Sequence, residues 1–100
     1  MLRRIVLDVL KPYEPSIVEL SKKLSSIKGV DGVNIVTYEI DKQVENVKIT
    51  IEGKGFSFKS VSRMLEDLGA AIHSVDEVAA GKKMIEDVEL PSETSASWLR

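Results

Sequence analysis

Acidic side chains are the groups in this sequence with the clearest capacity for chemistry. Asp8 interrupts a segment of alternating apolar residues, so it points to the face opposite Leu7 and Val9. Carboxylate oxygens are the ligands that the hard cations calcium and magnesium prefer. The sequence therefore suggests a cation site. Its candidate ligands are Asp8, Asp76 and Glu77 from one chain, with Glu39 or Asp41 joining from the next copy.

The alternative for Asp8 is a solvated carboxylate that pairs with Lys48 on an exposed face of a sheet, because such ion pairs are common and weak. A cation site would also have to be assembled across strands or subunits. The sequence contains no twelve-residue calcium-binding loop with its required Asp, Gly and Glu positions.

His73, with Asp76 or Glu77, has the residue types of an acid–base pair. Catalysis would also need a nucleophile or a metal, a closed pocket and an oriented partner. The sequence offers only the adjacent Ser74, and neighbouring residues of a strand point to opposite faces. We expect a structural or interface histidine and a protein that is not an enzyme.

Two loops rich in glycine or proline have the composition of ligand-binding turns. The segment Gly53–Gly55 lacks the spacing of a phosphate-binding loop, so we interpret it as a break that ends one strand before a helix. The segment Lys11–Pro15 precedes a helix and contains two prolines, which should end the preceding strand. Regulatory domains often hold amino acids at such a place between subunits, but a rigid turn is the simpler role.

Composition excludes several classes of site and partner. The 100 residues contain no cysteine and one histidine, which excludes disulfides, zinc–thiolate clusters and zinc sites with two or three histidines. Fourteen basic and sixteen acidic residues are interspersed, and only five residues are aromatic, so we expect no nucleic-acid partner. No apolar run approaches a membrane span or a signal peptide. We therefore expect no membrane partner and a cytoplasmic location.

Six elements must position these residues. In order, the patterns predict a strand over 3–10, a helix from Ser16 to Gly29, strands over 33–40 and 44–52, a helix from Ser57 or Ser60 to Gly69, and a strand over 71–80. The order βαββαβ is the split βαβ plan, an α+β ferredoxin-like sandwich. Its antiparallel sheet has the strand order 4-1-3-2, with both helices on one face. We expect one domain over 1–90 and a flexible tail over 91–100.

The last predicted strand has an unusual pattern. Its apolar residues Ile72, Val75 and Val78 are three apart, which suits neither a regular strand nor a helix. We expect a β-bulge there.

Four segments carry a resemblance to a known family. They are Leu7–Pro12, Gly29–Asn34, Glu39–Asp41 with Glu45–Gly53, and Ile72–Val78. Together they resemble a small, mostly archaeal family, domain of unknown function 211, over residues 2–90. The resemblance implies a ferredoxin-like fold and ring-like homo-oligomers, and it implies no established activity. The turn Gly29–Val33 also resembles regulatory domains of the ACT type and metallochaperones, but copper needs the thiolates that this chain lacks.

Apolar residues on the helix-free face predict self-association. Val6 and Leu10 point outward, and the strand over 33–40 carries apolar residues on both faces. A charge at Val6 or Ile35 should therefore dissociate the assembly. We expect a self-associating sensor or regulatory module that binds a divalent cation or small molecule. The alternatives are a structural or adaptor oligomer without a ligand and, last, an enzyme using His73.

Overall fold

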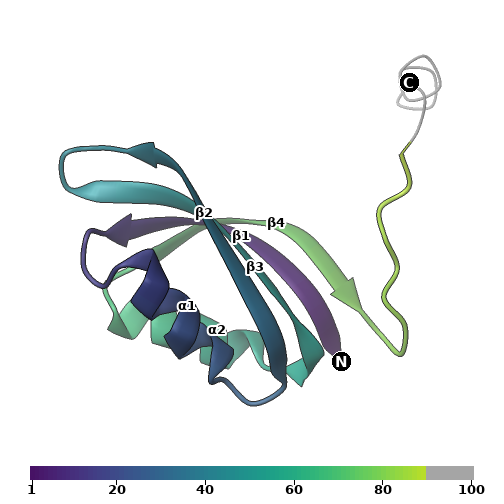
Figure 1. Cartoon of the computed structure of the whole chain (residues 1–100). Coiled ribbons are helices and arrows are strands. Elements are labelled where there is room, and N and C mark those ends of the chain that lie inside the picture. Colours follow the sequence, from purple (N-terminus) through teal and green to yellow (C-terminus); the bar gives the residue numbers. More distant parts are fainter. Residues whose placement is uncertain (90–100) are drawn as a thin grey trace.

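The computed structural model describes residues 1–89 and has the order βαββαβ. The elements are β1 (Leu2–Pro12), α1 (Ile17–Ser25), β2 (Val30–Ile40), β3 (Val44–Phe56), α2 (Phe58–Asp67) and β4 (Ala71–Ala80). The strands form one antiparallel sheet in the order β2-β3-β1-β4, and both helices lie on the same side of it (Figure 1). The predicted ferredoxin-like α+β fold and its strand order are confirmed. The predicted tail over 91–100 lies outside the described residues.

Both helices begin at a serine cap. The Ser16 hydroxyl accepts the backbone N–H of Glu19 at 3.2 Å, and the Ser57 hydroxyl accepts that of Ser60 at 3.1 Å. Each cap satisfies a backbone donor that the first turn leaves unpaired. The predicted end of the first helix at Gly29 is wrong, because α1 ends at Ser25 and a turn over 26–29 follows it. Gly29 lies at the end of this turn with a φ of 91°, a conformation that favours glycine.

The core lies between the sheet and the two helices. β1 and β3 each contribute three fully buried aliphatic residues in alternation, and each helix contributes two at helical spacing. These residues are Ile5, Leu7, Val9, Val47, Ile49, Ile51, Leu20, Leu24, Val61 and Leu65. Both helices cover the side of the sheet to which these residues point (Figure 1). The other side has no helix, and we call it the open face.

Two predicted strand ends are wrong. β1 continues past Leu10 to Pro12, which pairs with Val44. A proline is tolerated there because the last residue of a strand need not donate to the ladder. β3 continues through the glycines to Phe56, because Gly53 allows the backbone of Gly29 to approach. A Cβ atom at position 53 would lie 2.0 Å from the Gly29 carbonyl oxygen. That same oxygen accepts the N–H of Lys54 at 2.8 Å.

The start of β2 also differs from the prediction. The strand begins at Val30, three residues earlier than expected, because Val30 already pairs with Gly53. β2 is an edge strand, so its outer backbone groups have no partner strand in the sheet.

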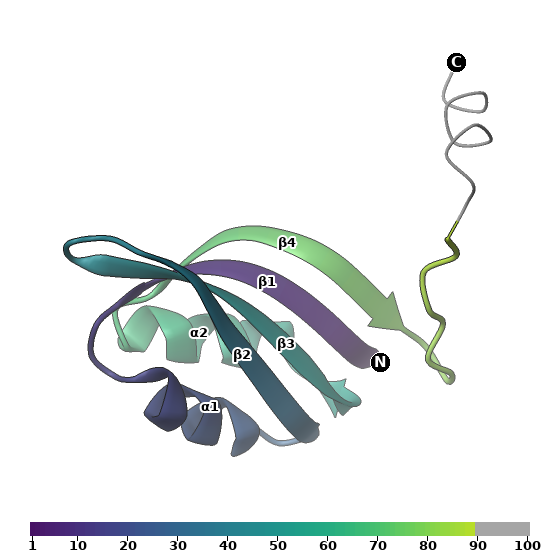
Figure 2. The same ribbon diagram turned by 45° about the horizontal axis from the view of Figure 1, so that its top comes forward.

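Strand β4 contains the predicted irregularity. Its three-residue apolar spacing is matched to the two-residue spacing of β1: Val78 lies opposite Ile5, Val75 opposite Leu7 and Ile72 opposite Val9. The register shifts leave Asp76 and His73 as extra residues of β4. All three apolar residues thus reach the helix-covered side, while β4 curves along β1 (Figure 2).

Within residues 1–89, no helix is long and apolar enough to cross a membrane.

Candidate site on the open face of the sheet

Asp8 lies near the centre of the open face. In the register of the sheet it is opposite Lys48 of β3 and Ser74 of β4, and Lys48 is in turn opposite Val36 of β2. Residues directly opposite each other on antiparallel strands share a face. The predicted position of Asp8 on the helix-free face, flanked by Lys48, is therefore confirmed. Within the described residues, the ion pairs do not include one between Asp8 and Lys48.

Tyr38 supplies the hydrogen bond that Asp8 accepts. Its phenol donates to Asp8 Oδ1 from edge strand β2, across the intervening strand β3. This bond, followed by partial burial and the negative charges of Asp8, Asp76 and Glu39, raises the pKa of Tyr38 to about 12. Tyr38 lies at a register shift of β2, between Thr37 and Glu39, so alternation along the strand could not have indicated that its hydroxyl reaches Asp8.

The other carboxylates proposed from one chain have separate partners. Asp76 accepts a hydrogen bond from the Ser74 hydroxyl at 2.7 Å. Glu77 lies 3.3 Å from Nη1 of Arg4. Residues 1–89 contain no group of three or more histidine or carboxylate side chains that could hold a metal ion. The structure therefore does not gather Asp8, Asp76 and Glu77 into one coordination sphere.

Glu39 and Asp41 lie at the far end of β2 and at the hairpin tip. Glu39 is opposite Asn46 and is exposed. Asp41 is exposed too, and its carboxylate accepts the N–H of Lys42 at 2.7 Å. Both side chains are accessible to another molecule, so their contribution to a site between copies stays a prediction.

Arg4 forms a second charged cluster on the same face. Its guanidinium contacts Glu52 at 2.8 Å and Glu77 at 3.3 Å, and it forms a two-pronged pair with Glu86 at 2.6 and 3.0 Å. The bonds to Glu86 and Glu52 raise the pKa of Arg4, and the bond to Arg4 lowers the pKa of Glu86. The cluster joins β1, β3 and β4 to the segment after β4. The period of two in β1 could have placed Arg4 beside Glu52, but nothing in the sequence indicated Glu86.

Lys11 is a buried cation that the sequence analysis missed. It is 1% exposed, and its ammonium donates to the carbonyl oxygens of Pro12, Tyr13 and Pro15 at 2.7, 3.3 and 2.7 Å. It also pairs with Glu45 at 2.9 Å. Every donor of the ammonium therefore has a partner, and the loop after β1 is tied to its own strand. Alternation along β1 places Lys11 on the same face as Ile5, Leu7 and Val9. This pattern could have indicated that Lys11 is buried.

His73 lies exposed at one of the irregularities of β4. Its neighbour Ser74 donates to Asp76. Of the residues predicted from this segment, the structure therefore brings Ser74 and Asp76 together.

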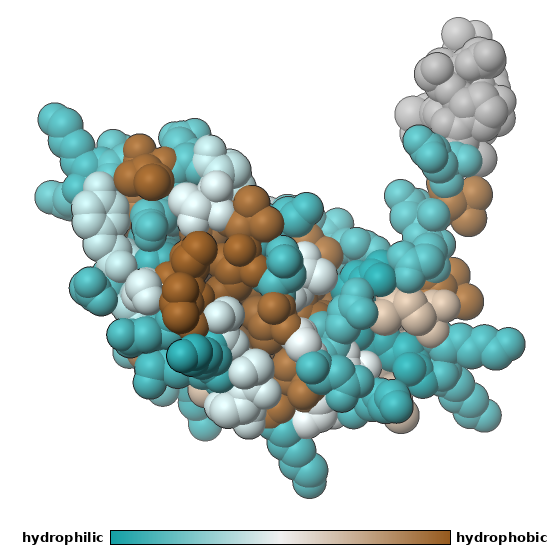
Figure 3. All heavy atoms as spheres, in the orientation of Figure 1, coloured by the Kyte–Doolittle hydropathy of each residue, from teal (hydrophilic) through white to brown (hydrophobic). Residues whose placement is uncertain are grey.

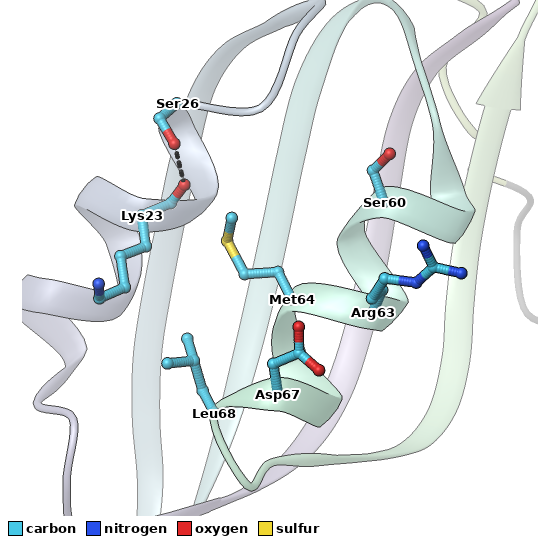
Figure 4. Close-up of a pocket in the computed structure, with 7 residues that line it drawn as sticks. All are labelled: Lys23, Ser26, Ser60, Arg63, Met64, Asp67 and Leu68. Carbon is cyan, nitrogen blue, oxygen red and sulfur yellow. Dashed lines mark hydrogen bonds between the residues drawn. The ribbon is translucent and has the colours of Figure 1, made fainter.

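A separate hollow of about 480 Å³ lies between α1 and α2, on the other side of the sheet (Figure 4). Met64 and Leu68 extend from α2 toward α1 and form its apolar part. The Arg63 guanidinium points away from α1, while Lys23 lies on α1 itself. The side chains of Arg63 and Lys23 do not converge on one point, so they could not bind the same anion together.

Comparison with known proteins agrees with the family resemblance of the segments quoted above. The model of the family named domain of unknown function 211, described as "Uncharacterized ArCR", matches residues 3–94. The chain belongs to this family. An uncharacterized protein of Methanocaldococcus jannaschii is 55% identical over 92 residues, which are 92% of this chain and 95% of that protein. The family membership and an archaeal relative are therefore established, and neither description carries an activity.

Proposed function

We propose that this member of the family is a non-enzymatic, self-associating module whose assembly completes a site for a divalent cation or a small molecule. In this role it acts as a sensor or regulatory component. The observation that supports the proposal is the open face itself, where exposed apolar side chains surround the polar pair of Asp8 and Tyr38.

The apolar part of this face is accessible. Leu10 is 36% exposed, Val36 is 47% exposed and Tyr38 is 55% exposed, while Val6 is half-buried. In the space-filling view, hydrophobic residues also gather in the middle of the molecule, where β2 passes in Figure 1 (Figure 3). Contiguous apolar surface is typical of an interaction site, and an uncovered edge strand is a template for pairing with another chain.

One of the two positions chosen from the sequence to test the interface is wrong. Ile35 lies opposite Ile49 and packs against the core. A charge there would damage the fold, because burying an unpaired charge costs several kcal/mol. Val36, the next residue, is on the open face and is the appropriate position.

Light scattering tests self-association. The native protein should have a mass several times 11.1 kDa at micromolar concentration. Val36→Glu should lower that mass, because a charge on the apolar face opposes its burial between copies. The matched control is Lys22→Glu, which changes the charge of an exposed residue on α1 and should leave the mass unchanged. A native protein that is monomeric at this concentration would contradict the proposal.

Thermal unfolding with ligands tests the site. The panel contains calcium, magnesium, amino acids and nucleotides, and a ligand at 100 times its Kd should stabilise the protein by about 2.7 kcal/mol. Calcium at millimolar concentration should raise the Tm of the native protein and leave that of Asp8→Asn unchanged. An oligomer that responds to no member of the panel would favour the alternative, a structural or adaptor assembly without a ligand.

A further inference from the structure

We propose that Trp98 docks into an apolar groove beside β4 of its own chain. The groove is formed by β1, β4 and the start of α2, and Trp98 belongs to the part of the sequence that follows the described residues. The inference goes beyond the proposed function, because the contact needs only one copy of the chain. It gives a role to the apolar pair Trp98–Leu99, which the proposed function does not use.

The groove is a small hollow of about 190 Å³ lined by apolar side chains alone. Its lining residues are Leu2, Ile5, Phe58, Val75 and Val78. The two irregularities of β4 create it, because they turn Val75 and Val78 to the side of the helices at the outer edge of the sheet. There α2 begins with Phe58 and does not cover them, so Val75 remains 47% exposed and Val78 56% exposed.

The segment after β4 returns to a wall of this groove. Ile85, Glu86 and Asp87 line a hollow together with Val78, and Val78 also lines the groove. Glu86 is held there by two bonds from the Arg4 guanidinium, at 2.6 and 3.0 Å. The chain is therefore bound beside its own β4 as far as Asp87.

The length of chain beyond Asp87 is sufficient to reach the groove. Trp98 follows eleven residues later, and eleven residues span at most about 36–40 Å. A flexible segment of this length has an average end-to-end distance of roughly 17–20 Å, so it need not be fully extended. The path crosses only the outer edge of β4, from the open face to the side covered by the helices.

Trp98 is the side chain that suits the groove. Residues 91–97 contain no large apolar side chain, so Trp98 and Leu99 have no competitor between Leu90 and the groove. A tryptophan ring buries a large apolar area and needs a partner only for its N–H. Since the valines of the groove are half-exposed, the ring can lie on them while its N–H stays in water.

The larger hollow between α1 and α2 is a poorer match. Its lining includes the charged residues Lys23, Arg63 and Asp67, whereas the groove has no charged or polar lining residue. An apolar ring gains more from a wall that is apolar throughout, because no polar group loses water.

The connection along the chain favours the same copy over a second one. A short flexible linker gives its two ends an effective concentration in the millimolar range. A second copy at micromolar concentration would have to compete against an excess of about a thousandfold. The groove of the same chain is therefore the preferred partner of Trp98.

The docked segment would cover the outer edge of β4. Proteins commonly protect an edge strand with a loop or with bulges, and β4 already contains two irregularities. With this edge covered, β2 is the edge of the sheet that another chain can approach.

Fluorescence tests the contact in the full chain, because Trp98 is the single tryptophan. In the native protein its emission should lie at shorter wavelength, and its quenching by acrylamide should be several-fold weaker, than in the protein unfolded by guanidinium chloride. Val75→Asp puts a charge in the groove and should raise the quenching nearly to that of the unfolded protein. The matched control is Val18→Asp, which changes a 60% exposed valine of α1 and should leave the quenching unchanged.

A milder variant guards against unfolding. Circular dichroism shows whether Val75→Asp is folded, and Val75→Thr keeps the shape of the side chain while adding a hydroxyl in the groove. Val75→Thr should raise the quenching in the same direction by a smaller factor. Native quenching equal to that of the unfolded protein, or equal effects of Val75→Asp and Val18→Asp, would overturn the inference.

A mixing experiment separates the two possible copies. Val75→Asp, which has Trp98 but a charged groove, is refolded at micromolar concentration together with Trp98→Ala, which has an intact and empty groove. Quenching of Trp98 should stay high, because its own groove is spoiled and the other is not tethered to it. A return to the weak quenching of the native protein would identify a second copy as the partner and refute docking within one chain.

Discussion

At the scale of single residues, the hydrogen bond from Tyr38 to Asp8 defines what the open face offers a ligand. The phenol stays protonated well above its usual pKa of about 10, so it is a permanent donor at neutral pH. It occupies one carboxylate oxygen of Asp8. A cation that binds Asp8 must therefore share this carboxylate with Tyr38 or displace the phenol.

The titration of Tyr38 tests this hydrogen bond. In the background Tyr13→Phe, where Tyr38 is the remaining tyrosine, phenolate absorbance should appear near pH 12. Asp8→Asn should move the transition down toward pH 10, because the charged acceptor is lost. A raised folded pKa means that the contribution of Tyr38 to stability is complete below about pH 10 and is lost as the pH rises through about 12. An unchanged transition in Asp8→Asn would refute the assignment.

Loss of the buried Lys11 side chain, near the end of β1, should destabilise the fold strongly. Lys11→Ala removes the partner of half-buried Glu45 and leaves the carbonyls of Pro12 and Pro15 without their donor. Breaking a buried pair on one side costs about 3–5 kcal/mol. Chemical denaturation should show a loss of this size, whereas exposed Lys22→Ala should cost less than about 0.5 kcal/mol. Equal losses in the two variants would show that the buried network contributes nothing.

At the scale of elements, β4 pairs with β1 although the apolar residues of the two strands have different spacings. Two extra residues convert an apolar spacing of three into the spacing of two that β1 requires. The conversion also makes β4 the irregular edge of the sheet. At the other edge, β2 pairs regularly from Gly32 to Thr37 and has a register shift on each side of that stretch.

Single-residue deletions test this account of β4. Deletion of Asp76 removes one extra residue and leaves Val75 and Val78 two apart, so the strand can pair regularly and the protein should stay folded. Deletion of Thr50 from β3 has no such escape, because a shift of one residue turns the following side chains to the other face. Circular dichroism and thermal unfolding should show a folded protein in the first case and an unfolded one in the second. Equal damage from both deletions would contradict the bulge.

At the scale of the whole molecule, the sheet has one face covered by helices and one face without them. A domain of 100 residues buries roughly 60–70% of the surface that its extended chain would expose, which limits the stability of a single copy. The proposed association through the open face would cover apolar surface that the fold itself leaves in water.

The thermal stability of the assembly should depend on protein concentration. Dissociation accompanies unfolding of an oligomer, so the Tm of the native protein should rise as its concentration increases. The same series with Val36→Glu should show a weaker dependence, while Lys22→Glu should behave like the native protein. A Tm of the native protein that is independent of concentration would argue for a monomer.

The sequence predicted the fold well because its main signals are local. Periods of two and of three to four residues mark the strands and helices, and Ser16 and Ser57 mark the starts of the helices. The order of the elements then restricts the topology to few choices. The errors of the prediction lie where a contact with a distant part of the chain overrides a local rule. Pro12 closes a strand, and Gly53 continues one because the Gly29 carbonyl lies against it.

The candidate site was predicted only in outline. Alternation in β1 placed Asp8 on the open face, and the unusual spacing in β4 indicated a bulge. The partners of the charged groups depended on distances between segments far apart in the chain: Tyr38 to Asp8 and Glu86 to Arg4. The sequence by itself thus determined which residues share a face, since backbone geometry imposes that period. Only the tertiary structure decided which of them touch, because hydrogen bonds and ion pairs form over a few ångströms and depend on register, bulges and the path of the chain.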